Sequence, residues 1–246
     1  MKITFFGTSH GYPEPNRRCS SALVEVCGKR ILIDIGCNIS ENLISRGMAV
    51  DSIDAIFITH MHGDHTHGLI PYLDICSWRF KTADPEIFLP ADVKTVYERA
   101  NAWVSLNGTE LRDFRMKEIS EGVIYDDGQI KVTAFKTMHI DVSYAFLIEA
   151  DGKRVFFSGD LCHKGPEHDF PLCILDAPLD LAVCEAAHFE AYKYVDLFAG
   201  KEDNLKRLCF NHFSARRTKS VYEVKDTAKF PVIIASDGLE IRLEEK

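Results

Sequence analysis

Residues 59–65 read Thr-His-Met-His-Gly-Asp-His and follow directly on an apolar run at residues 55–58. A short apolar run of this kind is typical of a buried strand, which ends at a sheet edge where the next side chains can converge. Neutral imidazole is the commonest protein ligand for zinc and related metals. We therefore expect His60, His62 and His65 to point toward a metal site. A solvated histidine-rich loop is the alternative, and the close spacing directly after a strand argues against it.

Asp64 and Gly63 in this stretch are expected to have different roles. Asp64 is expected to face a second centre, and because a carboxylate can also take up a proton, Asp64 is a candidate catalytic residue as well. Gly63 is expected to help a tight turn bring the side chains together. Asp34, which follows another apolar run, is expected to brace the metal loop as a capping or turn carboxylate rather than to bind the metal.

Further polar residues stand just past predicted strands, where α/β proteins gather their chemistry: His139, Asp160, His188 and His212. Asp160 is a candidate ligand by residue type, whereas a lone His139 or His212 is more often a hydrogen-bonded polar residue. His188 is a candidate general acid, and Glu185 shortly before it would orient the imidazole. The alternatives stay open, since His188 could cap a helix at the surface and Glu185 could be a solvated carboxylate.

Composition restricts the class of protein. The 246 residues are 46% hydrophobic and 27% charged, which suits an ordinary soluble globular protein with one large core or two modest ones. The amino terminus does not resemble a signal peptide, and no stretch approaches the roughly 20 apolar residues of a membrane span. The eight cysteines form no Cys-x-x-Cys pair, so we expect reduced thiols in a cytoplasmic protein. A net charge of −8 argues against nucleic-acid binding over the whole surface, although a local basic patch remains compatible with it.

Hydrophobic patterning predicts an α/β fold in which two sheets pack as a sandwich covered by helices. Strands are expected at residues 3–6, 22–26, 31–33, 55–58, 87–89, 130–135, 144–149, 155–157, 181–184, 208–210 and 232–235, with weaker candidates at 119 and 123–125. Helices are expected at residues 40–46, 69–80, 93–106, 192–198 and 221–227. Gly28-Lys29 is expected to form a hairpin turn, and Asp92 to cap a helix. No linker divides the chain, so we expect residues 1–246 to form one domain of two similar halves, roughly 1–128 and 129–246.

The order of these motifs resembles the metallo-β-lactamase superfamily, and within it the ribonuclease Z-like branch. The hallmark of the superfamily is His60-x-His62-x-Asp64-His65, which is highly specific. Residues 6–9 with Gly11 and Pro13 are similar to the glycine-rich opening of the branch, and residues 33–36 are similar to its Asp-x-Gly turn. Ser158-Gly159-Asp160 and His212-Phe213-Ser214-Ala215-Arg216 are similar to two later elements. The resemblance therefore runs nearly from end to end.

The resemblance implies a four-layer αββα sandwich with a dinuclear metal site at the rim of its two sheets. Residue by residue, it assigns one ion to His60, His62 and His139, the other ion to Asp64, His65 and His212, and a bridging position to Asp160. Zinc is the expected metal, with manganese or iron as alternatives because a mixed histidine and aspartate set does not select sharply. Two divalent ions about 3.5–4 Å apart lower the pKa of a shared water, which gives a bridging hydroxide for hydrolysis.

The expected activity is that of a metal-dependent hydrolase acting on a phosphodiester. Arg216, Arg217 and Lys219 follow His212 and could neutralise a phosphate, although a solvated basic turn is the ordinary explanation of such a trio. The same site could hydrolyse a carboxylic ester, lactone or thioester. A non-hydrolytic metal sensor or redox centre is a weaker alternative, and a structural module is weaker still because the candidate ligands exceed a closed four-coordinate site.

One departure from the branch bears on the substrate. Ribonuclease Z has a long arm that grips tRNA between the positions of His139 and Asp160, whereas only twenty residues separate them in this chain. The late His-Ser/Thr element of the branch also has no counterpart after Glu185. We therefore expect a small-molecule substrate instead of extended nucleic acid and no membrane partner, and a homodimer stays open as the assembly.

Overall fold

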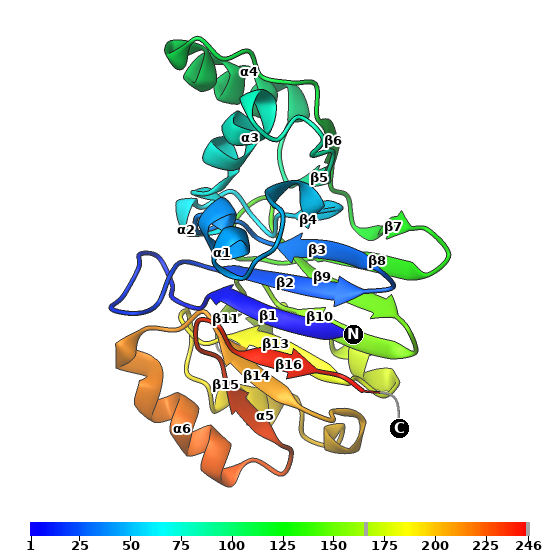
Figure 1. Cartoon of the computed structure of the whole chain (residues 1–246). Coiled ribbons are helices and arrows are strands. Elements are labelled where there is room, and N and C mark those ends of the chain that lie inside the picture. Colours follow the sequence, from blue (N-terminus) through cyan, green and yellow to red (C-terminus); the bar gives the residue numbers. More distant parts are fainter. Residues whose placement is uncertain (165–166, 245–246) are drawn as a thin grey trace.

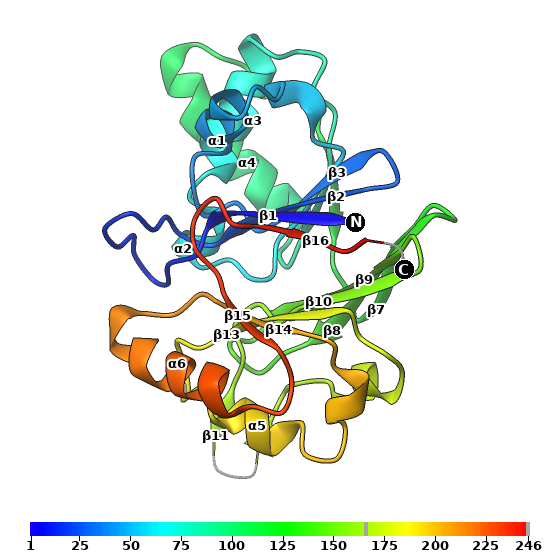
Figure 2. The ribbon, with the colours of Figure 1, turned by 60° about the horizontal axis from the view of Figure 1, so that its bottom comes forward.

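The computed structural model describes residues 1–164 and 167–244, and residues 165–166 and 245–246 lie outside this description. Two large sheets stack face to face, and helices cover the outer face of each (Figures 1 and 2). This arrangement is the expected four-layer αββα sandwich.

The first sheet has seven strands in the order β16-β1-β2-β3-β4-β5-β6. Their bounds are β1 (Lys2–Gly7), β2 (Ser21–Val26), β3 (Lys29–Ile33), β4 (Ala55–Phe57), β5 (Glu86–Leu89), β6 (Arg115–Glu118) and β16 (Glu240–Arg242). Strands β1 to β3 form an antiparallel meander, whereas β3 to β6 run parallel to one another. The carboxyl ends of the parallel strands therefore meet at one edge of this sheet.

The second sheet repeats this combination in the order β15-β14-β13-β10-β9-β8-β7. Its strands are β7 (Gly122–Asp126), β8 (Ile130–Lys136), β9 (Tyr144–Ala150), β10 (Lys153–Phe157), β13 (Leu181–Glu185), β14 (Leu208–Asn211) and β15 (Val232–Ile234). Strands β7 to β10 are antiparallel, and β10, β13, β14 and β15 are parallel. A separate short hairpin joins β11 (His163–Lys164) to β12 (Glu167–His168).

The helices form the two outer layers. Those of the first half are α1 (Ile39–Ser45), α2 (Gly63–Thr66), α3 (Leu69–Trp78) and α4 (Val93–Val104), and those of the second are α5 (Lys193–Leu197) and α6 (Thr218–Thr227). Figure 2 shows α1, α3 and α4 over the first sheet and α5 and α6 over the second. The 3-10 turns are η1 (Val50–Ser52), η2 (Ser105–Asn107), η3 (Leu172–Asp176), η4 (Glu202–Asn204) and η5 (Ala215–Arg217).

Burial on both faces explains why most strands read as continuous apolar runs. In β3, Ile31 and Ile33 point into the core between the two sheets, while Leu32 points into the core beneath the first helical layer. A third core lies between the second sheet and its helices and includes Tyr194 and Phe210. Because alternate side chains of a strand enter different cores, neither face has to be polar.

Most predicted elements are confirmed, and the exceptions have local reasons. The hairpin turn lies at Cys27-Gly28 rather than Gly28-Lys29, because Cys27 and Gly28 adopt the positive φ that such a turn requires. Gly63 does not adopt a positive φ. It begins helix α2, so a helical turn and not a tight glycine turn brings the ligand loop around.

Other differences concern elements with weak sequence patterns. Helix α6 begins at Thr218, before the predicted start, and the predicted helix ending at residue 106 finishes as a 3-10 turn closed by Gly108 in the left-handed region. Strand β6 ends just before Ile119. The sheets follow the two sequence halves except that β7 belongs to the second sheet and β16 to the first.

All eight cysteines are free thiols. Within residues 1–164 and 167–244, no helix combines the length and the apolar character that a membrane crossing requires.

Candidate metal centre

The predicted ligands meet at the edge where the carboxyl ends of the parallel strands come together. The histidine-rich loop follows β4, Asp160 follows β10, and His212 follows β14. His139 follows β8, which runs in the same direction as β10 because β9 lies antiparallel between them. His60, His139, Asp160 and His212 thus each lie one to three residues beyond the end of a strand, and the sandwich brings the two sheet edges to one place.

One group of donors contains His60, His62, His139 and Asp160. The Nδ1 atom of His62 lies 3.0 Å from Nε2 of His60 and 3.1 Å from Nε2 of His139. The Oδ2 atom of Asp160 lies 3.6 Å from Nε2 of His60 and 3.5 Å from Nε2 of His139. Three ring nitrogens and one carboxylate oxygen therefore converge on one point.

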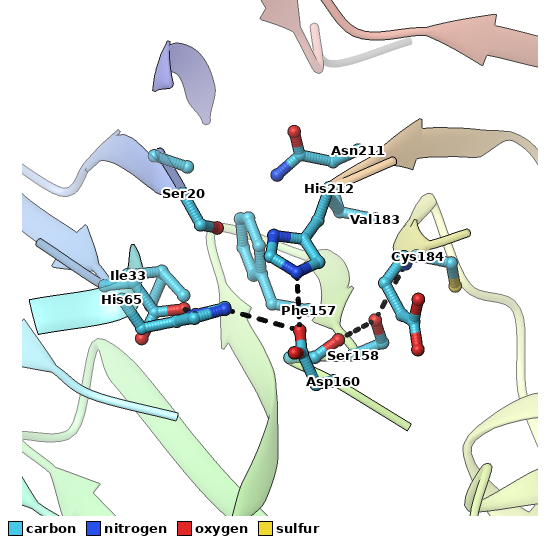
Figure 3. A pocket seen from close by; sticks show the side chains of 14 residues that line it. Ser20, Ile33, His65, Phe157, Ser158, Asp160, Val183, Cys184, Asn211 and His212 are labelled. Atoms are coloured by element: carbon cyan, nitrogen blue, oxygen red, sulfur yellow. Dashed lines mark hydrogen bonds and ion pairs between the residues drawn. The ribbon is translucent and has the colours of Figure 1, made fainter. Parts of the chain in front are cut away.

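The second group contains Asp64, His65 and His212, all of them buried. The other oxygen of Asp160, Oδ1, lies 3.2 Å from Nε2 of His212 and 3.4 Å from Nε2 of His65 (Figure 3). The Oδ2 atom of Asp64 lies 3.6 Å from Nε2 of His65 and 3.7 Å from Nε2 of His212. Asp160 therefore presents one oxygen to each group, which is the geometry a bridging carboxylate needs.

Asp34 supports the second group from behind. Its Oδ2 atom lies 2.7 Å from Nδ1 of His65, and its Oδ1 atom accepts a hydrogen bond from the Thr59 backbone N–H at 2.7 Å. A carboxylate at Nδ1 fixes the tautomer of the ring and leaves Nε2 free as a ligand atom. Asp34 thus lies where a brace of the metal loop is expected.

The electrostatics of the donors follow from burial and from their neighbours. Burial lowers the pKa of His60 to about 2, and the nearby His65 acts in the same direction. Burial also disfavours the charged form of His65, but the carboxylates of Asp34 and Asp160 outweigh it and raise the pKa of His65 well above its ordinary value. Burial acts against the charge of Asp160, whereas His212 and His65 lower the pKa of Asp160 well below its usual range. The site thus concentrates negative charge beside imidazoles.

Backbone geometry shapes the strand ends that carry these donors. Gly159 has φ +55, and a Cβ atom there would lie 2.9 Å from both the Thr59 side chain and the carbonyl oxygen of Tyr144. Only glycine fits this close approach without displacing its neighbours. His212 also lies in the left-handed region, with φ 49. A non-glycine residue in this region is uncommon, and such residues cluster at functional sites.

The two groups fit divalent metal ions. Ligand atoms about 2.0–2.1 Å from a tetrahedral zinc ion lie roughly 3.3 Å apart, close to the spacing of the three ring nitrogens of the first group. Nε2 of His65 and Oδ1 of Asp160 are buried and have no hydrogen-bond partner among the residues that the structure describes. Buried polar atoms without partners are costly, and a cation held by the second group would contact both atoms. Imidazole and carboxylate are donors that zinc, manganese and iron accept.

His188 lies beside the first group and contacts the buried carboxylate of Glu185. Glu185 is 1% exposed, and its Oε1 atom lies 3.1 Å from Nδ1 of His188 and accepts a hydrogen bond from the Leu161 N–H. The Nε2 atom of His188 faces Oδ2 of Asp160 at 3.7 Å. Burial opposes protonation, but the hydrogen bond and charge of Glu185 raise the pKa of His188 to about 9. The ring thus faces the metal centre and does not cap helix α5, whose N-cap is Tyr192.

Arg216 and Arg217 lie at a pocket of about 750 Å³ that also includes His10, Tyr12 and Glu190. They differ in their partners, because Arg217 forms an ion pair with Glu190. Arg216 is exposed, and in the described part of the chain no ion pair holds it. Of the two arginines, Arg216 is therefore the one free to contact an anion.

Some contacts of the site involve residues to which the sequence assigned no part in it. The backbone N–H of Gly11 donates to Oδ2 of Asp64 at 2.6 Å, although 53 residues separate them. His10 lies against His212, with ring centroids 6.3 Å apart, and burial lowers its pKa. The glycine-rich opening at residues 6–13 was the available signal, because a loop of this type permits close approach of the backbone to a site. Residues 163–168 carried no such signal.

Sequence relatives and structural neighbours together identify the chain as a ribonuclease Z-like protein with the metallo-β-lactamase fold. A family model described as "Anti-Pycsar protein Apyc1" matches residues 1–168, and the chain belongs to this family. Ribonuclease Z of Geobacillus kaustophilus is 33% identical over 156 residues, covering 61% of this chain and 50% of the relative. Ribonuclease Z of Archaeoglobus fulgidus is 30% identical over 165 residues, covering 67% and 53%. The chain thus spans about half the length of the curated relatives it matches.

Solved structures agree on the fold. The short form of human tRNase Z matches with a TM-score of 0.75 at 24% identity, covering 100% of both chains. The metallo-β-lactamase fold protein YhfI from Bacillus subtilis matches with a TM-score of 0.76 at 18% identity, covering 98% of both chains. A diphosphatase of the PhnP family matches with a TM-score of 0.70 at 20% identity, covering 99% of this chain and 98% of that one. At these identities the likeness establishes the architecture alone.

Proposed function

We propose that the protein is a metal-dependent hydrolase of phosphodiesters. The observation that carries the proposal is the placement of Asp160 between two donor groups, with the paired His188 and Glu185 beside them. Relatives named ribonuclease Z and a structural neighbour titled a diphosphatase support hydrolysis at phosphorus rather than at a carboxylic ester.

Two divalent ions, most simply zinc, are proposed to occupy the two groups, with Asp160 bridging them. When bound, such ions lower the pKa of a water and neutralise the charge that develops on a phosphoryl group. His60, His62 and His139 would hold one ion, and Asp64, His65 and His212 the other. Asp34 and the N–H of Gly11 keep His65 and Asp64 in position for this task.

His188 is proposed to supply the proton that the leaving oxygen needs. Glu185 receives the Nδ1 hydrogen of His188, which leaves Nε2 directed toward the centre. A pKa of about 9 keeps this proton in place at neutral pH. As the bond from phosphorus to the leaving oxygen breaks, that oxygen takes the bonding electrons and the proton from Nε2.

Arg216 is proposed to contact the substrate from the other side of the centre. It is exposed in the 750 Å³ pocket beside His212, whereas the ion pair with Glu190 turns Arg217 into a support for the loop. A guanidinium near a phosphate oxygen or a polar substituent favours an anionic substrate. The preference for a small diester over tRNA rests on the short connection between His139 and Asp160.

The test combines metal analysis with a panel of substrates. Protein loaded with zinc should contain two ions per chain by elemental analysis, and His67→Ala, which changes an exposed histidine outside both groups, should retain them. The loaded protein should hydrolyse bis(para-nitrophenyl) phosphate faster than para-nitrophenyl acetate, and small diesters faster than a precursor tRNA. Hydrolysis of the acetate without the diester would overturn the proposed class, and one ion or none after loading would overturn the dinuclear site.

We also propose that the protein works in a reducing compartment, the cytoplasm, because all eight cysteines are free and several are buried. Localisation of a tagged protein by fractionation tests this directly.

A further inference from the structure

A second, smaller pocket lies on the His188 side of the centre. It measures about 300 Å³, and the residues that matter for its chemistry are Met138, His139, Cys162, His163, Lys164 and His188. One wall of the smaller pocket is strand β11, whose residues His163 and Lys164 come shortly after Asp160 in the chain. Its inner wall consists of a proposed ligand and the proposed general acid.

The two pockets share no lining residue. The larger pocket includes Ala187, Arg216 and Arg217, whereas the smaller includes His139 and His188. The rings of His139 and His188 lie 4.5 Å apart, so this pocket opens where the first donor group meets the acid. A phosphodiester has two ester arms, and displacement at phosphorus places the leaving oxygen next to the acid that protonates it. The smaller pocket, which His188 lines, is therefore the one that lies next to the acid.

The charged residues of β11 and β12 indicate which charge the leaving group of the substrate should have. Lys164 is exposed and lines the pocket, and it is the only lysine or arginine among the described lining residues. Burial lowers the pKa of His163, so His163 adds no positive charge at neutral pH. Glu167 stands opposite Lys164 in the register of the hairpin but does not line the pocket. The pocket is thus compact and carries one positive charge that Glu167 partly offsets.

We propose that the hairpin makes this pocket the binding site of the leaving alcohol, and that Lys164 selects compact leaving groups bearing a negative charge. The proposal rests on the proposed diesterase activity. In the reaction, water supplies the oxygen that bonds to phosphorus, the bond to the leaving arm breaks, and the freed alcohol is held by Lys164 until release. The products are a phosphomonoester and an alcohol, so no oxidant or further co-reactant is required.

Three substrates separate the two arms. Methyl para-nitrophenyl phosphate is the neutral-arm reference. An analogue with a carboxylate on the nitrophenyl ring places a charge on the leaving arm, and carboxymethyl para-nitrophenyl phosphate places it on the retained arm. For each protein, kcat/KM of a charged substrate is divided by kcat/KM of the neutral reference. The ratio of a variant is then divided by that of the zinc-loaded wild-type protein, so that differences in the chemical reactivity of the substrates cancel.

Lys164→Ala should lower the ratio for the ring carboxylate about two- to fivefold, the range expected for one exposed ion pair, and Lys164→Glu should lower it further. Glu167→Gln should raise the same ratio, and added salt should reduce all these differences. Arg216→Glu should change only the ratio for the carboxymethyl substrate. Lys94→Ala on α4, whose side chain is 82% exposed, is the matched control and should change neither ratio.

An unchanged ring-carboxylate ratio in Lys164→Glu would overturn the inference, as would a change confined to the carboxymethyl substrate. The pocket can also be tested without turnover by titrating the zinc-loaded protein with the freed leaving arm, a hydroxy-nitrobenzoate, and measuring binding by calorimetry. Weaker binding to Lys164→Glu than to the unchanged protein supports the pocket, and equal binding overturns it. If no diester is hydrolysed, the proposed activity fails, and the calorimetric result still decides the inference.

Discussion

The two donor groups differ in how the protein supports them. In the second group Asp64, His65 and His212 are all buried, and an aspartate and a backbone N–H hold His65 and Asp64. In the first group His62 is exposed and His139 is half-buried. There the outer support for His60 is the Thr59 hydroxyl, 3.1 Å from its Nδ1 atom.

The difference suggests a division of tasks across the centre. Ligands that are locked by hydrogen bonds lose little freedom when a metal binds, so the second group is suited to anchor an ion tightly. The first group borders His188 and the smaller pocket, where a substrate must enter and leave. We therefore expect the buried group to bind its ion first and more tightly, and the exposed group to face the reacting substrate.

Removal of the shared carboxylate should have the largest effect. Asp160→Ala removes a donor from both groups at once, so activity should fall by about 10⁴-fold, the size seen when a residue that acts as a unit with its neighbours is lost. Turnover of bis(para-nitrophenyl) phosphate and elemental analysis measure it. Circular dichroism should show a retained fold, because Asp160 lies at a strand end outside the three apolar cores. Near-normal turnover with both ions bound would mean that another residue bridges the groups.

The next largest effect should appear on the exposed side. His188→Ala should reduce hydrolysis of alkyl phosphodiesters by about 10²–10⁴-fold, because an alkoxide leaves poorly without a proton. Nitrophenyl diesters should be nearly unaffected, since nitrophenolate departs without help, and metal content should not change. His67→Ala is the matched control. Equal losses on both substrates with both ions retained would instead make His188 a positioning residue.

The buried side can be weakened through its outer support. Asp34→Asn removes the charge behind His65 and should reduce metal affinity about 10- to 100-fold for one of the two ions. Thr59→Val, which removes the hydroxyl beside His60, should have a smaller effect on the other ion, although the hydroxyl also donates to Asp34. Competition with a chromogenic chelator resolves the two affinities. If both variants weaken the same ion equally, the proposed division between the groups is wrong.

Much of this architecture could be predicted from the sequence, for a physical reason. Strands such as β3 and β4 are buried on both faces, so their apolar runs stand out against polar turns. The histidine-rich loop is compact in sequence because one loop supplies donors to both groups. These features depend on local residue order, which a sequence displays directly.

The features that could not be predicted depend on contacts between residues that are far apart in the sequence. The pairing of β16 with β1 joins the two ends of the chain, and the bond from Gly11 to Asp64 joins two loops. Strands β11 and β12 have two residues each and are polar, so they lack any hydrophobic period. The ion pair that occupies Arg217 involves Glu190 from another loop. Local patterns do not encode such partners.

The smallest expected effect is a shift in the pH dependence of kcat, which tests whether Glu185 controls the proton on His188. Because Glu185 raises the pKa of His188 above its ordinary value to about 9, the acid form is present at neutral pH and is lost as pH rises through that pKa. Glu185→Gln removes the negative charge, and burial then favours the neutral ring. The fall in kcat for an alkyl diester should therefore begin about 1–3 pH units lower in the variant. Bound cations will lower the pKa of His188 in both proteins, so the difference between their pH profiles is the quantity to measure.

Glu190→Gln, at the rim of the larger pocket, is the control and should not shift the pH profile. Thermal denaturation should check that the buried amide of Glu185→Gln does not unfold that variant. Identical pH profiles with both proteins folded and fully loaded would show that Glu185 does not control the proton on His188.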